Sequence, residues 1–235
     1  IRDKAESRGL EMCIRDSYSA HYGAFKFIFE KEYEEYDNIL FCDTDIFTVD
    51  NLKVSIFDNF TSDIGICEEP FQPKQRTITT GRITSERDNE WAKLIEKAYG
   101  GVMPRTEDNL MKVYNTGVVL YSKNGMKKAR EYFVDFQKYV KLIRENNLDS
   151  FYTCDQPYLH AMLFSKPFDV CIMDNEWNSY VHGTRNKYQP KRRIVDHRTE
   201  NTKFVHCQFP GADELDEETL LRVVNLPREQ WGYDI

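Results

Sequence analysis

The chain has 235 residues, of which 40% are hydrophobic and 14% aromatic, so it can bury one sizeable core, and disorder of the whole chain is excluded. A formal net charge of −7 argues against nucleic acid as a partner, whereas a bound divalent cation can still attract a small anion. No apolar run approaches the roughly 18 residues of a membrane span. None of the six cysteines forms a Cys-x-x-Cys pair, which favours reduced thiols and a cytoplasmic protein.

Residues 1–17 differ in character from the rest of the chain. They are charged and poorly periodic, and their end, EMCIRDS, resembles a peptide translated from sequencing-adapter sequence. We therefore expect residues 1–17 to be non-native or disordered, and the natural protein to continue upstream. Residues 18–235 contain no internal repeat or low-complexity segment and are expected to form a single, partial domain.

Helical and strand-like segments alternate along the remaining chain. Helical spacing of apolar residues predicts helices at 18–35, 51–60, 86–99, 124–146, 155–165 and 214–224. Short apolar runs predict strands at 38–42, 63–67, 113–122, 169–173 and 203–209. Between them, the polar connection 69–85 is long enough to be a functional loop. This alternation predicts an α/β fold with a mainly parallel sheet flanked by helices.

The strongest motif is YDNILFCDTDIF, at residues 36–47. An apolar strand ends and is followed at once by two carboxylates, Asp43 and Asp45. Ligands of open α/β sheets bind beyond the carboxyl ends of the strands, and paired hard oxygen ligands suit Mn²⁺ or Mg²⁺. A solvated turn is the alternative, because Asp is common in turns. The strand before the carboxylates and the apolar pair after them favour a metal site.

This segment resembles the Asp-x-Asp strand of GT-A glycosyltransferases, specifically the glycogenin and bacterial lipopolysaccharide galactosyltransferase group of family 8. An aromatic-basic pair precedes that strand in the group, and Phe25-Lys26 matches it, with Lys in place of the usual Arg. The resemblance implies a GT-A, Rossmann-like mixed sheet. It also implies that Asp43 and Asp45 hold a metal, that Asp43 and Lys26 contact substrate, and that the metal binds a nucleotide diphosphate.

A second matching segment is YNTGVVLY, residues 114–121. It resembles the family's Asn-Ser/Ala-Gly turn before a hydrophobic strand, which places Asn115 beside the donor sugar. At Gly117 the missing side chain would let the backbone approach the ligand closely. The alternative is an ordinary Asn-x-Gly turn into a strand.

Two more segments match in the same order. TCDQPYLHAML carries the family's Asp-Gln pair, which implies a catalytic role for Asp155 and Gln156 facing the sugar; the alternative is that Asp155 only caps a helix. MDNEWNSY resembles the family's Trp-Asn segment, which implies acceptor contacts for Trp177 and Asn178. A core tryptophan is the alternative for Trp177.

The last matching segment is KFVHCQFPG, near the C-terminus. In the resembling enzymes its histidine, His206 here, is the third protein ligand of the metal. A lone histidine is more often not a ligand, and only folding could bring this one to the Asp-x-Asp turn. The family continues with Gly and Lys-Pro-Trp, whereas Gly211 here has no Lys-Pro-Trp after it. The basic residues between 185 and 193 could replace that lysine or form a solvated loop.

The resemblance implies a retaining transferase that uses Mn²⁺ (or Mg²⁺) to move sugar from a nucleotide-sugar, a UDP-sugar, to a hydroxyl of a glycan, lipid-glycan or protein acceptor. The family's first β-α-β elements, which bind the nucleoside, normally precede Asp43 by more residues than are present here. We therefore expect the chain as written to bind donor poorly. Two alternatives remain: a non-catalytic sugar- or nucleotide-binding protein, and a haloacid-dehalogenase-type phosphatase, whose pattern needs Thr or Val where Phe47 stands.

Overall fold

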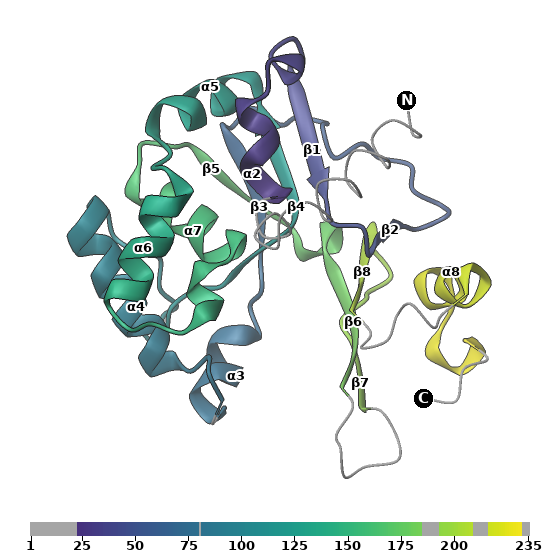
Figure 1. Ribbon diagram of the computed structural model, residues 1–235. Coiled ribbons are helices and arrows are strands. Elements are labelled where there is room, and N and C mark those ends of the chain that lie inside the picture. The colour runs from purple at the N-terminus through teal and green to yellow at the C-terminus, as the bar shows by residue number, and fades with distance from the viewer. Residues whose placement is uncertain (1–22, 80, 185–192, 209–215, 232–235) are drawn as a thin grey trace.

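A computed structural model describes residues 23–79, 81–184, 193–208 and 216–231. Two four-stranded sheets form its centre, and most of the helices cover the first of them (Figure 1). Residues 1–17 and the basic residues 185–192, for which the sequence supported predictions, lie outside the described residues.

The first sheet has the strand order β1-β4-β3-β5. These strands are β1 (Asn38–Cys42), β4 (Tyr114–Ser122), β3 (Ile64–Glu68) and β5 (Val170–Met173). β4 runs antiparallel to both of its neighbours, and β3 pairs parallel with β5. The predicted α/β class with a mixed sheet flanked by helices is therefore confirmed. The prediction of a mainly parallel sheet is wrong, because β4 lies in the opposite direction between β1 and β3.

The second sheet has the order β2-β8-β6-β7. Its strands are β2 (Ile46–Thr48), β8 (Phe204–Gln208), β6 (Ser179–Thr184) and β7 (Arg193–Asp196). β6 and β8 are parallel, and the two outer pairings are antiparallel. Only β8 was predicted from the sequence. β2, for example, has three residues, too few to show an alternating pattern.

Three of the predicted helices are present, with ends that lie within three residues of the predicted ones. α4 (Ser85–Tyr99) starts after Thr84, whose hydroxyl accepts a hydrogen bond from the Arg87 amide, and it ends at Gly100 with φ +81°. α7 (Asp155–Ser165) is buried on all sides, and α8 (Glu217–Asn225) packs beside the second sheet.

Other helical predictions are wrong. Residues 124–146 form two helices, α5 (Lys123–Tyr132) and α6 (Phe136–Glu145), because Phe133 is extended and Asp135 caps α6 by accepting from the Lys138 amide. The predicted helix 18–35 consists, where described, of α2 (Gly23–Lys26) and two 3₁₀ turns, Phe27–Phe29 and Lys31–Tyr33. Residues 51–60 form turns instead of a helix. The connection 69–85 contains an unpredicted helix, α3 (Gln72–Ile78).

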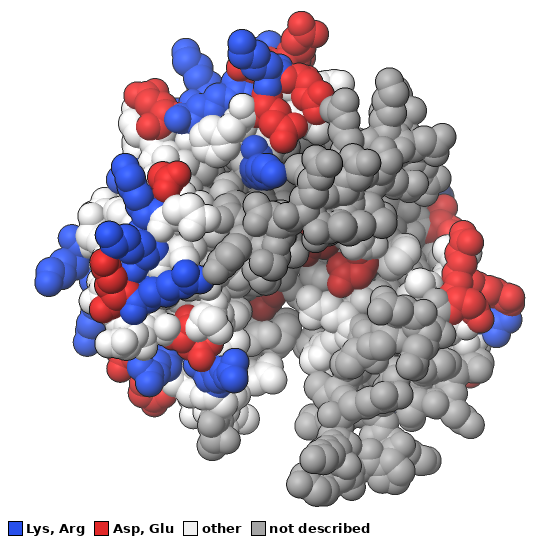
Figure 2. All heavy atoms as spheres, in the orientation of Figure 1, with Lys and Arg blue, Asp and Glu red and all other residues white. Residues whose placement is uncertain are grey.

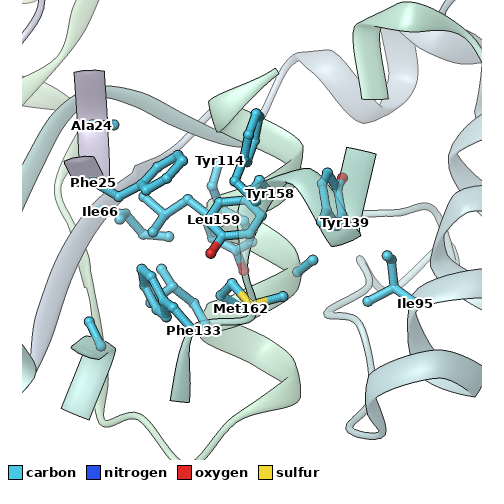
Figure 3. Packing of buried hydrophobic residues seen from close by; sticks show 14 of the residues in the cluster. Ala24, Phe25, Ile66, Ile95, Tyr114, Phe133, Tyr139, Tyr158, Leu159 and Met162 are labelled. Atoms are coloured by element: carbon cyan, nitrogen blue, oxygen red, sulfur yellow. The ribbon is translucent and has the colours of Figure 1, made fainter. Parts of the chain in front are cut away.

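The largest hydrophobic core lies between the first sheet and helices α2 and α4–α7. Its aromatic rings pack against one another: the Phe25 ring lies 4.5 Å from that of Tyr158 (Figure 3). The Phe25 ring also lies 5.4 Å from that of Phe136. A smaller cluster joins the two sheets, since Val118 and Leu120 of β4 pack with Phe204 of β8. This second cluster holds the carboxyl end of β1 beside β8.

Two properties of the described residues bear on earlier expectations. No helix among them combines the length and apolarity that crossing a membrane requires. The five described cysteines are all free thiols.

On the face shown in Figure 2, basic and acidic side chains are interspersed over the helical half, with no large area of one charge sign among the described residues.

Candidate metal and sugar site

The Asp-Thr-Asp segment forms the turn between the two sheets. The Asp43 amide donates to the Gly117 carbonyl (2.8 Å), which extends the β1–β4 ladder by one bond, and the Ile46 amide closes the turn on the Asp43 carbonyl (3.2 Å). The Cys207 amide then donates to the Asp45 carbonyl (2.8 Å), which continues the pairing of β2 with β8. The backbone therefore holds both carboxylates between the two sheets.

Strand pairing brings His206 to this turn. His206 lies opposite Ile46 in the β2–β8 register, and its Nε2 is 3.3 Å from Asp45 Oδ1. One ligand atom each from Asp43, Asp45 and His206 lies within 4.8 Å of the others; these three residues are called the metal group below. The predicted approach of His206 to the two carboxylates is confirmed.

The metal group has the donors and the spacing for a divalent cation. Donors bound to one such ion at roughly 2.1 Å lie about 3 to 4 Å apart, so small rotations would bring all three onto it. Carboxylate oxygens with one imidazole nitrogen suit Mn²⁺ better than Ca²⁺, which prefers oxygen alone. Burial raises the pKa of Asp43 to about 6; His206 opposes this shift, while the charges of Asp155 and Asp45 add to it. A cation would relieve this accumulation of negative charge.

Asn115 and Gly117 lie at a bulge of β4 beside the metal group. The β3–β4 register shifts between Ile66, opposite Val119, and Cys67, opposite Asn115, so residues 116–118 have no partner on β3. The Asn115 oxygen accepts from the Gly117 amide (2.7 Å), and its amino group donates to Glu69 Oε1 (2.8 Å). The structure therefore brings both predicted residues to the site, with the Asn115 side chain buried.

Asn178 lies directly behind His206. Its amino group donates to the Asn115 oxygen (2.7 Å), and its own oxygen lies 3.1 Å from His206 Nδ1. Asn178 is only 3% exposed, so little of it is available to a ligand. Trp177 contacts the cluster between the sheets: its ring meets Phe204 edge-on at 5.2 Å, and Lys203 Nζ lies 4.9 Å from its centroid. Trp177 therefore packs against this cluster while remaining partly exposed.

Asp155 begins α7 and lies near enough to Asp43 to raise its pKa. The capping position is held by Cys154, and Asp155 Oδ1 accepts from the Gln156 amide (2.8 Å) in the first turn. Gln156 lines an open pocket with residues such as Arg76 and Tyr114, and no member of the metal group lines that pocket. Asp155 therefore lies within electrostatic range of Asp43, and Gln156 lines the neighbouring pocket.

Lys26, the basic residue of the aromatic-basic pair, is exposed at the end of α2. Its neighbour Phe25 is buried in the largest core, against Tyr158 of α7. Phe25 therefore anchors α2 against the helix that carries Asp155 and Gln156.

The sequence prediction missed three residues of the site: Glu69, Tyr180 and Gln208. Tyr180 stacks on the His206 ring at 4.7 Å and donates from its hydroxyl to Glu69 Oε1 (2.5 Å). The Gln208 amide nitrogen lies 3.0 Å from His206 Nε2. Two of the three had a signal: Glu69 opens the polar connection after the strand predicted at 63–67, and Gln208 is two residues beyond His206, on the same face of its strand.

Comparisons with known proteins give one structural match to report. No protein-family model matches the sequence, and no curated protein matches it significantly. Among solved structures, the chain matches the apo crystal structure of mouse xyloside xylosyltransferase 1 with a TM-score of 0.46 and 18% identity. The match covers 85% of this chain and 66% of the mouse chain, so this chain spans just under two thirds of the length of that structure.

Proposed function

We propose that this chain carries the metal and donor-sugar half of a GT-A glycosyltransferase site of the family 8 type. The reaction moves a sugar from a UDP-sugar to an acceptor hydroxyl, with retention of configuration. The observation that carries the proposal is the convergence of Asp43, Asp45 and His206, because the resemblance required it and no local pattern in the sequence enforces it.

The three side chains of the metal group would hold Mn²⁺. The ion would supply Lewis-acid stabilisation of the charge that grows on the departing diphosphate. Backbone bonds to β4 and β8 fix the main chain of Asp43 and Asp45, so only side-chain rotations would be needed to bind the ion. His206 is 1% exposed, stacked on Tyr180 and held by Asn178, so its imidazole is equally constrained.

The donor sugar would lie between the metal group and the start of α7. Asp155 and Gln156 are at the N-terminal end of that helix, where hydroxyl groups of a sugar can reach both a carboxylate and an amide. Asn115 and Gly117 would form the floor of this region, and Lys26 the rim. The acceptor, a glycan, lipid-glycan or protein hydroxyl, would approach from the open side near Gln156.

Metal binding is the most direct test, since it needs only the metal group. We expect the chain to bind one Mn²⁺ in a calorimetric titration, and Asp45→Asn to abolish that binding. Asp50→Asn is the matched control, because Asp50 is an exposed aspartate near the same turn. Absence of saturable Mn²⁺ binding, or equal binding by the Asp45→Asn chain, would overturn the site.

Sugar transfer is tested by metal-dependent release of UDP from UDP-sugars. The assay uses this chain and, in parallel, a version in which additional upstream residues replace residues 1–17. Asp45→Ala should abolish the release, whereas unchanged metal-dependent activity would contradict the site assignment. Binding without turnover would favour the non-catalytic alternative, and release of phosphate from a simple phosphomonoester would favour the phosphatase.

A further inference from the structure

A row of buried hydrogen bonds runs from Glu69 through Asn115 and Asn178 to His206. The three bonds measure 2.8, 2.7 and 3.1 Å. All four residues are at most 6% exposed. With so little access to water, each polar group depends on the partner that the protein provides.

The direction of these bonds is set at Asn115. Glu69 Oε1 accepts from Asn115 and also from the Tyr180 hydroxyl, so the amino group of Asn115 must face it. The Gly117 amide can only donate, so the oxygen of Asn115 must face Gly117. If the Asn115 amide were rotated by 180°, its amino group would face the Gly117 amide and its oxygen would face Glu69 Oε1, and neither pair could form a hydrogen bond. Its orientation is therefore determined from both sides.

The orientation of the Asn115 amide in turn fixes the orientation of the Asn178 amide, which contacts the His206 imidazole. The Asn115 oxygen accepts from the Asn178 amino group, which leaves the Asn178 oxygen to face His206 Nδ1. An oxygen acceptor at that position requires a hydrogen on Nδ1. A neutral imidazole carries one N–H, so Nε2 presents its lone pair.

The surroundings of Nε2 agree with this tautomer. The Gln208 amide, 3.0 Å away, can donate to the lone pair. Asp45 Oδ1 lies 3.3 Å from His206 Nε2. Both atoms are then acceptors, so no hydrogen bond can form between them. A cation held by both groups would satisfy them, and would take the place of the Gln208 amide at the Nε2 lone pair.

We propose that Asn178 is a positioning residue, which transmits the bond direction set by Glu69 and Gly117 to His206 and keeps Nε2 as a cation ligand. The inference rests on the proposed metal site and gives Asn178 a role behind the ligand. Partners behind a metal-bound histidine fix its tautomer and orientation in this way, and their loss typically lowers metal affinity by about 10- to 100-fold.

The first test measures the tautomer directly in the metal-free chain. Long-range proton–nitrogen correlation spectra of ¹⁵N-histidine-labelled protein, recorded in alkaline buffer, distinguish the two neutral forms, and His206→Gln identifies the signal. We expect His206 to carry its hydrogen on Nδ1. A hydrogen on Nε2 would overturn the proposal, and this result needs no variant of Asn178.

Two variants test the transmission. Asn178→Leu removes the oxygen that faces Nδ1, and Asn115→Leu removes the partner that orients Asn178 without replacing Asn178 itself. Both should shift His206 towards a mixture of tautomers, whereas Asn124→Leu, which changes an asparagine bonded to Asp63, should leave it unchanged. If His206 kept its hydrogen on Nδ1 in both Asn178→Leu and Asn115→Leu, the proposal would be overturned.

Titration with Mn²⁺ alone separates this inference from the proposed function. We expect Asn178→Leu to bind Mn²⁺ about 10- to 100-fold more weakly than the unaltered chain. Equal affinity would overturn the positioning role and leave the metal site intact. If the unaltered chain shows the Nδ1–H tautomer and binds no Mn²⁺, the proposed function fails instead.

Discussion

Gly117 lies directly against the His206 ring. A Cβ atom at Gly117 would come within 2.8 Å of His206 Cε1 and within 2.8 Å of the Asn115 oxygen. Both distances are shorter than real Cβ contacts, and both neighbours are buried. The absence of a side chain at this position therefore lets β4 pack against the imidazole.

Gly117→Ala should consequently displace His206 from the metal group. We expect a loss of stability of about 1–3 kcal/mol, which is the usual cost of overpacking, and at least tenfold weaker Mn²⁺ binding. Chemical denaturation and Mn²⁺ titration measure the two effects. Gly81→Ala is the control, since the nearest atom to its added Cβ would lie at 3.5 Å. Unchanged Mn²⁺ affinity in Gly117→Ala would contradict the packing argument.

Asp43 should destabilise the metal-free chain at neutral pH. Its pKa of about 6 lies above the ordinary value of 3.8, so the folded chain holds the proton more tightly, and the stability from this group is lost as pH rises from about 4 to 6. Asp43→Asn should raise the free energy of unfolding at pH 7 by about 1–2 kcal/mol, after a reduction for partial exposure. The gain should vanish near pH 4.

Urea unfolding in the presence of a chelator, at the two pH values, measures this difference. The same substitution should abolish Mn²⁺ binding, so Asp43 lowers the stability of the metal-free chain but is needed to bind the ion. If the Asp43→Asn chain is less stable than the unaltered chain at pH 7, another interaction of Asp43 dominates and the prediction is wrong.

His160 should make the folded chain less stable as the pH falls below about 6.5. Burial and the charge of Arg76 lower its pKa to about 3, so it stays neutral in the folded chain while the unfolded chain protonates it below about pH 6.5. Its Nε2 has no hydrogen-bond partner among the described residues, and its ring contacts Trp91, Tyr114 and Phe164.

His160→Phe should therefore change stability by less than about 1 kcal/mol at pH 7 and raise it by about 2 kcal/mol at pH 5. Denaturant unfolding at the two pH values checks this. His182→Phe is a useful comparison, because His182 is only partly buried and its pKa is lowered less far. An equal effect of His160→Phe at both pH values would rule out the protonation mechanism.

The Arg76–Asp88 ion pair should be costly to break. Arg76 Nη1 contacts both Asp88 oxygens, at 2.9 and 3.0 Å, and Asp88 Oδ1 also accepts from the Tyr152 hydroxyl (2.7 Å). Asp88→Leu leaves the guanidinium buried without a partner and should cost about 3–5 kcal/mol. The double variant Arg76→Met/Asp88→Leu should recover much of that loss, as thermal denaturation of the single and double variants would show. Additive losses would contradict this.

The sequence alone predicted the parts of the fold that depend on local chemistry. Strand β1 was predicted to its residue boundaries, because a short apolar run ends at a charged turn, and helix α4 was predicted to within one residue, because charged and apolar positions repeat at helical spacing. The order of Asp43-Asp45, Asn115, Asp155-Gln156 and His206 likewise came from the sequence.

Tertiary structure decided the rest, because these features depend on contacts between distant residues. The direction of β4 and the short strands β2, β6 and β7 are set by strand pairing that no window of sequence contains. The same holds within the site. Asp-x-Asp by itself fits a solvated turn, and only the pairing of β2 with β8 places His206 beside it. The burial of Glu69 and the orientation of Asn178 follow from hydrogen bonds between distant residues, because buried donors and acceptors depend on partners that the protein itself provides.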